Sequence, residues 1–180
     1  MNAIDTVLVP IDFSDCAASV VQRASQLAAQ VHARVVLMHA VDTPVGLSPD
    51  AIIEDDEGAP VRAGDHMRGA AESRMPDYLA LARSEGVEAT STVAPGKPAE
   101  AILATADALS ADLIVMGTHG RQGLKRMLIG SVAEAVVRRA DAPVMTLRSQ
   151  RVDSCEASSC GTCTSHVYRE LDKARGEVDG

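Results

Sequence analysis

The sequence predicts an α/β protein with a doubly wound, five-stranded parallel sheet and helices on both faces. Five short apolar runs alternate with segments of helical periodicity, and right-handed crossovers between parallel strands place the helices on both sides. One run, residues 35–41, is almost continuously apolar, as is typical of a strand buried on both faces. The chain has one Phe, two Tyr and no Trp, so small aliphatic side chains must fill the core.

The first unit of the chain is a strand, a helix and a second strand. Residues 6–11 are apolar and rich in β-branched side chains, and this strand ends at Asp12. Apolar residues then recur at helical spacing over residues 17–31, with Ser14 as the expected N-cap. The run 35–41 completes a βαβ unit.

Residues 42–65 differ from this pattern because they are acidic and contain several helix- and strand-breaking residues. These are Pro44, Gly46, Pro49, Gly58, Pro60 and Gly64. We expect a long loop here, either a lid over a site or a solvated insertion.

The second half of the chain is also expected to alternate helices with strands. Residues 66–85 are expected to form a helix that Pro76 kinks or divides and that stops at Gly86. The remaining expected elements are a strand at 87–93, a helix from Pro98 to about Leu109, a strand at 113–116, a helix at 131–140 and a strand at 144–147.

Composition and charge exclude several classes of function. A length of 180 residues fits one main core, and a net charge of −8 without basic–aromatic clusters argues against nucleic-acid binding. No window approaches the roughly 20 apolar residues of a membrane span. Asp5 and Asp12 interrupt the first apolar run, so no signal peptide is expected. We expect a cytoplasmic protein whose four cysteines are thiols or metal ligands.

A glycine pattern follows the fourth expected strand. Gly117-Thr-His-Gly120 is followed by nine residues and then by Gly130-Ser131, which opens a helix. Glycines let backbone amides approach phosphate oxygens, and the helix N-terminus and Ser131 hydroxyl supply further donors. The ends of parallel strands meet at one edge, where Asp12 and Gly117 are both expected. The pattern therefore predicts phosphate binding, although each part alone is also an ordinary turn or cap.

Together these residues resemble the ATP-binding signature of the universal stress protein family. The segment VMGTHGRQGLKRMLIGSV at 115–132 carries the signature, and the strand ends VPIDFS, MHAVD and APVMTL agree with it. The resemblance covers roughly residues 4–148 and implies an adenine-nucleotide α-hydrolase-like, Rossmann-like domain at 1–148. Residues 149–180 are then a Cys-rich C-terminal tail.

By this resemblance the chain belongs to the branch that retains the glycines and binds ATP, with Mg²⁺ neutralising the phosphates. Asp12 and the backbone near Ala40 would contact adenine and ribose, Gly117 the ribose, and the later motif residues the phosphates. The implied nucleotide-binding set is Pro10, Ile11, Asp12, Ala40, Met116, Gly117, His119, Gly120, Gly130, Ser131 and Val132. Asp12 also has an ordinary interpretation as a helix-initiating acid, and His119 one as a loop-packing residue.

The implied function is a nucleotide-dependent stress-response or regulatory module with an unidentified protein partner. The family also implies a homodimer that pairs through the last strand, residues 144–147. No catalytic acid or base is evident, so at most slow ATP hydrolysis is expected, with a genuine ATP hydrolase as an alternative. A Walker-type P-loop and a dinucleotide fingerprint are both missing.

The tail offers a separate hypothesis. Cys155, Cys160, Cys163 and His166 lie within a short stretch, and three thiolates with one imidazole suit a tetrahedral Zn²⁺ site. The Cys160–Cys163 pair can equally be redox-active, or the segment can be a disordered tail without either role. A metal-binding or redox adaptor that works through these residues is therefore the alternative function.

Overall fold

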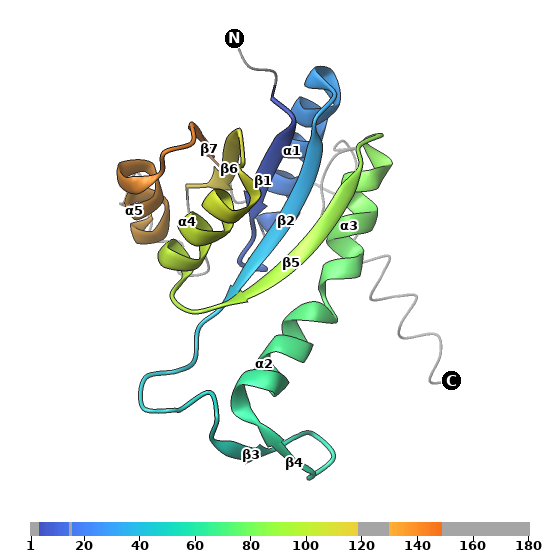
Figure 1. Cartoon of the computed structure of the whole chain (residues 1–180). Helices are drawn as coiled ribbons and strands as arrows, with labels where there is room; N and C mark the ends of the chain where they lie inside the picture. The colour runs from blue at the N-terminus through green and yellow to red at the C-terminus, as the bar shows by residue number, and fades with distance from the viewer. Residues whose placement is uncertain (1–3, 15, 119–129, 149–180) are drawn as a thin grey trace, which may run out of the picture.

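The computed structural model describes residues 4–14, 16–118 and 130–148, and Figure 1 shows how their elements are arranged. The elements in chain order are β1 (Thr6–Pro10), α1 (Ala17–Val31), β2 (Arg34–Val41), β3 (Ile52–Glu54), β4 (Pro60–Arg62), α2 (Ala63–Glu72), α3 (Met75–Ser84), β5 (Ala89–Pro95), α4 (Pro98–Leu109), β6 (Leu113–Gly117), α5 (Ser131–Arg139) and β7 (Val144–Leu147). The main sheet has five strands in the order β5-β2-β1-β6-β7, and all its pairings are parallel. The predicted fold class is confirmed.

Two hydrophobic clusters lie on opposite faces of this sheet. Val7 and Val9 of β1 pack with side chains of α1 and α3, whereas Leu8 between them packs with side chains of α4 and α5. This alternation follows from the two-residue period of a strand. Figure 1 shows the two helix pairs on either side of the sheet, so the doubly wound arrangement places helices on both faces.

Strand order reverses between β1 and β6. The chain steps outward from β1 to β2 and β5, then returns to the other side of β1 with β6 and β7. In parallel sheets the loops beyond the strand ends part at such a reversal and leave a crevice. The ends of β1 and β6 near Asp12 and Gly117 flank this point, as the sequence predicted.

The expectation of an unstructured loop over residues 42–65 is wrong. Strands β3 and β4 form an antiparallel hairpin, and Ala63 already begins α2. The Asp55 carboxylate accepts hydrogen bonds from the amides of Glu57 and Ala59 at 3.0 and 2.8 Å, and Gly58 has φ +81°. The Gly and Pro residues therefore shape a tight turn and the strand ends.

The helix expected at 66–85 is divided into α2 and α3, with Ser73 and Arg74 at the junction and Pro76 in the first turn of α3. Pro76 thus starts a helix, where its missing N–H costs nothing. Strand β5 begins at Ala89, two residues later than expected. The guanidinium of Arg83 donates to the Ala89 carbonyl at 2.8 Å and fixes this start.

Ser14 does not act as the side-chain cap of α1. The N-cap position is Cys16 and has no side-chain cap hydrogen bond, while the Ala17 amide donates to the Ser14 carbonyl at 2.9 Å.

Within the described residues, no helix is both long and apolar enough to cross a membrane.

Candidate functional site

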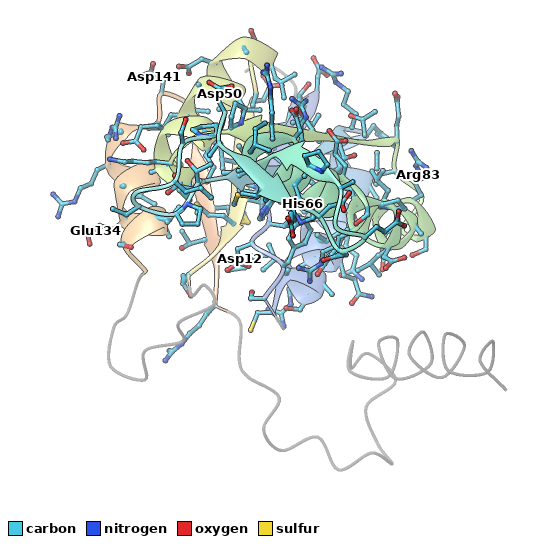
Figure 2. All side chains as sticks on the ribbon, turned by 90° about the horizontal axis from the view of Figure 1, so that it is seen from below. Asp12, Asp50, His66, Arg83, Glu134 and Asp141 are labelled. Carbon is cyan, nitrogen blue, oxygen red and sulfur yellow. The ribbon has the colours of Figure 1, made fainter. Side chains whose placement is uncertain are left out.

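A cavity of about 830 Å³ opens at the carboxyl edge of the sheet, where strand order reverses. Its walls come from the ends of β1, β2 and β6, the starts of α1, α4 and α5, and the junction of α2 with α3. Figure 2 looks onto this edge, with Asp12 between Glu134 of α5 and Arg83 of α3. The volume lies within the range of small-molecule sites, roughly 300–1,000 Å³.

The N-terminus of α5 faces this cavity. The first hydrogen bond of the helix ladder runs from the Glu134 amide to the Gly130 carbonyl at 2.9 Å. The amides of Ser131, Val132 and Ala133 precede that ladder, and all three residues line the cavity. Gly130 is the N-cap and makes no side-chain cap hydrogen bond. The positive end of the helix dipole and its first amides can therefore receive an anion.

Gly130 is held by a close backbone contact. Its amide donates to the Thr118 carbonyl at 2.7 Å, and a Cβ at Gly130 would lie 3.2 Å from that oxygen. The φ of −72° is accessible to any residue, so the requirement for glycine comes from the close approach of the backbone. Thr118 is buried, and its amide in turn donates to the Leu147 carbonyl at 3.0 Å.

The end of β2 provides a second polar surface. Strand β1 stops pairing at Pro10, opposite Met38, so β2 continues beyond its neighbour with β5 on the other side alone. The Met38 carbonyl accepts from the Ile11 amide at 2.8 Å, which places its hydrogen-bonding groups on the β1 side. The amide and carbonyl of Ala40 point to the same side, because these groups alternate between the two sides of a strand from one residue to the next and Ala40 lies two residues after Met38. Ala40 thus offers a donor and an acceptor next to the cavity.

The turn after β1 brings Asp12 and Phe13 to the cavity wall. The Asp12 carboxylate accepts from the Ser14 amide at 3.1 Å, which fixes its position. Phe13 has φ +58°, in the left-handed region that bulky residues rarely occupy. Such strain commonly occurs at functional sites. The turn directs the Phe13 ring toward β2 and α3.

An aromatic cluster forms around Phe13. Its ring centroid lies 4.2 Å from that of His39 and 5.6 Å from that of Tyr78. The guanidinium carbon of Arg74 lies 4.2 Å from the Phe13 centroid. The Nδ1 of His39 donates to the Ile11 carbonyl at 2.8 Å, so this half-buried histidine also connects β2 to β1.

The structure brings most of the sequence-predicted residues together. Every predicted nucleotide-binding residue within the described part of the chain lines the cavity, namely Pro10, Ile11, Asp12, Ala40, Met116, Gly117, Gly130, Ser131 and Val132. His119 and Gly120 lie outside the described residues. So does the predicted metal set of Cys155, Cys160, Cys163 and His166, which remains a sequence prediction.

Sequence reasoning missed part of the wall. Phe13, Asp42, Met67 and Arg74 line the cavity as well. The Phe13 and Arg74 contacts depend on the helix break before Pro76, and the sequence signalled that break without showing what the junction would face. Cys16 is half-buried and also lines the cavity.

Comparison with known proteins agrees with this architecture. The model of the universal stress protein family matches residues 3–148. The chain belongs to the universal stress protein family. The family match therefore includes the five-stranded sheet, the hairpin and every described wall of the cavity.

Individual relatives extend over most of the chain. Universal stress protein MJ0531 of Methanocaldococcus jannaschii is 30% identical over 152 residues, which cover 83% of this chain and 85% of that protein. A universal stress protein solved in complex with cAMP superposes with a TM-score of 0.62 at 24% identity, over 83% of this chain and 100% of that chain. The Archaeoglobus fulgidus universal stress protein in complex with dAMP superposes with a TM-score of 0.57 at 21% identity, over 82% of this chain and 100% of that chain. These two structures share the fold.

Proposed function

We propose that the chain is an ATP-binding universal stress protein that acts as a nucleotide-dependent regulatory module. The observation that carries this proposal is the position of the α5 N-terminus. Its first amides open into a cavity of about 830 Å³ at the reversal of strand order. A site with anion donors at one end and apolar walls at the other suits a nucleotide.

The phosphates would bind at the α5 end. The amides of Ser131, Val132 and Ala133 and the Ser131 hydroxyl are available as donors, and Gly130 allows the ligand to approach the backbone. Glu134, the acid in the first turn, is ion-paired with Arg138 at 2.9 Å along the exposed side of the helix. Its charge is therefore partly balanced away from the phosphate position.

The base would bind at the β2 end. The amide and carbonyl of Ala40 form a donor–acceptor pair, and the edge of adenine presents the matching pair in its N1 acceptor and N6 amino group. Asp12 and Gly117 lie between the two ends and would contact the ribose. Asp12 is the residue whose carboxylate is already oriented by the Ser14 amide. The set implied by the sequence thus maps onto an extended nucleotide.

Mg²⁺ would accompany the phosphates. Among the described residues no group of three His, Cys, Asp or Glu side chains could hold a metal ion. This fits Mg²⁺, which keeps several waters and is commonly bound through substrate phosphates with one or two carboxylates. Asp12 and Asp42 are the carboxylates that the described residues contribute to the cavity wall. We assign no catalytic residue.

Two proteins of the same fold support an adenine nucleotide as the ligand. One universal stress protein was solved in complex with cAMP and another in complex with dAMP. Both ligands contain adenine and phosphate, the two groups that the cavity ends would bind in this chain.

The decisive test is calorimetric titration of the full chain with ATP and Mg²⁺, beside the Gly130→Asp variant. The added Cβ would crowd the Thr118 carbonyl, and the carboxylate would repel phosphate at the helix N-terminus. We expect saturable binding by the native chain and a loss of at least roughly a hundredfold in the variant.

Gly69→Asp is the matched control because it makes the same substitution at an exposed helical position where a Cβ meets no atom within 4 Å. It should bind ATP like the native chain. Equal affinities of native protein and Gly130→Asp, with both folded, would place the phosphates elsewhere. Absence of binding by the native chain would end the ATP proposal.

We further propose a homodimer that pairs through β7. This strand is hydrogen-bonded to β6 on one side and is the last strand of the main sheet among the described residues. Met145 of β7 and Val137 of α5 are exposed at 39% and 46%. An edge that no described residue pairs, flanked by apolar side chains, suits pairing with a second copy about a twofold axis.

A further inference from the structure

We propose that the guanidinium of Arg74 stacks on the base of the bound nucleotide and so contributes to affinity through the base rather than through the phosphates. This inference rests on the proposed nucleotide site. It assigns a role to the junction between α2 and α3, which the glycine motif does not involve.

The first observation is the arrangement of Arg74 itself. One side of its guanidinium lies against the Phe13 ring, with 4.2 Å between the guanidinium carbon and the ring centroid. The residue is exposed and lines the cavity. No carboxylate of a described residue forms an ion pair with it. The planar group is therefore positioned by an aromatic ring and accessible to a ligand.

The second observation is the support beneath this pair. Phe13 is held between His39 of β2 and Tyr78 of α3, and the Tyr78 side chain is 3% exposed. His39 is fixed by its hydrogen bond to the Ile11 carbonyl. The stack from the core to Arg74 is thus built on the buried Tyr78 and the half-buried Phe13 and His39, and this packing lowers the entropic cost of stacking a ligand on it.

The third observation is the position of Arg74 relative to the N-terminus of α5. Arg74 lies over Phe13, whose ring packs on His39 of β2, whereas the α5 amides follow β6, and β1 separates the two strands. Neighbouring strands lie about 4.8 Å apart, so the ends of β2 and β6 are about 10 Å apart across the sheet. A nucleotide whose phosphates bind at α5 therefore extends its base toward Arg74.

The chemistry of the pair suits a flat aromatic ligand. Guanidinium planes stack on nucleobases as well as on aromatic side chains. Arg74 is also the one Arg or Lys among the described residues of the cavity wall. A lysine at this position would keep the positive charge and lose the planar surface.

The test compares full-length Arg74→Met and Arg74→Lys with the native chain by calorimetry in Mg²⁺, using ATP, AMP and inorganic tripolyphosphate as ligands. If the base stacks on the arginine plane, Arg74→Met should lower the affinities for ATP and AMP by a similar factor, roughly tenfold. Arg74→Lys should lose most of the same affinity. Tripolyphosphate binding should change less than about twofold in both variants.

Arg68→Met is the control because Arg68 is an exposed cation of α2, paired with Glu72 at 2.8 Å and absent from the cavity wall. It should bind all three ligands like the native chain. Thermal unfolding would check that each variant folds.

Several results would overturn the inference. An equal loss of tripolyphosphate affinity, or a loss that grows from AMP to ATP, would show that Arg74 acts on the phosphates. Full ATP affinity in Arg74→Lys would show that charge alone matters, and full affinity in Arg74→Met would show no contact at all. If the native chain binds no ATP, the proposed function fails first, and this inference fails with it.

Discussion

Ser25 of α1 is a polar residue in a largely apolar core. This α1 residue is fully buried, and its Oγ has no hydrogen-bond partner among the described residues. A buried hydroxyl without a partner costs about 1–3 kcal/mol relative to an apolar group of the same shape. The serine therefore lowers the stability of this helix contact.

We accordingly predict that Ser25→Ala raises the free energy of unfolding by about 1 kcal/mol, measured by urea denaturation of the full chain. Ser19→Ala is the matched control on the same helix, because the Ser19 hydroxyl donates to the Cys16 carbonyl at 2.9 Å. That variant should not gain stability. A clear destabilisation by Ser25→Ala would contradict the assignment of an unpaired hydroxyl.

Single residues also show how much of the site could be predicted from the sequence. Asp12 follows a predicted strand, and Gly130 and Ser131 stand at the start of a predicted helix, so their convergence at the carboxyl edge was predictable from topology. Phe13 was not, because its left-handed backbone and its ring contacts depend on three elements that meet only in the folded chain. Local sequence carries no signal for an aromatic residue at φ +58°.

At the scale of elements, the parallel strands were easier to predict than the inserted segment. A buried parallel strand produces a continuous apolar run, and the predicted bounds of β1, β2, β6 and β7 lie within one residue of those observed. Strands β3 and β4 have three residues each, and no residue in them is fully buried. Their backbone pairing is set by the turn at Asp55, which composition alone did not reveal.

Because the hairpin contributes little to the core, its removal should be tolerated. The Ala63 amide donates to the Ala51 carbonyl at 2.9 Å, so the residues that flank positions 52–62 are adjacent. Replacing 52–62 with two glycines should change the free energy of unfolding by less than about 1 kcal/mol. Thermal and urea unfolding measure this change. A loss of several kcal/mol would show that the hairpin makes stabilising contacts that its exposure does not indicate.

At the scale of the whole molecule, the sheet has two different edges. Strand β5 lies at one edge and β7 at the other, and the exposed apolar side chains Met145 and Val137 accompany β7. The sequence predicted the parallel order because strand–helix alternation leaves few topologies. It did not predict which side chains of the last strand and helix remain uncovered, since that depends on packing.

The proposed β7 dimer predicts that Met145→Lys weakens self-association, because a charge would be buried at the pairing edge. Sedimentation velocity over a range of concentrations should show a monomer fraction at least about tenfold larger than in the native chain. Val31→Lys is the control, since Val31 is similarly exposed at 38% but lies at the end of α1. Monomeric native protein, or equal effects of both substitutions, would contradict pairing through β7.

The hydrogen bonds at Thr118 join the two proposed interfaces. Gly130 at the start of α5 donates to the Thr118 carbonyl, and Thr118 donates to the carbonyl of Leu147 at the end of β7. Two consecutive backbone contacts therefore connect the proposed phosphate end of the cavity to the proposed pairing edge. If both proposals hold and this connection couples them, the factor by which nucleotide changes the dimer constant must equal the factor by which dimerisation changes nucleotide affinity.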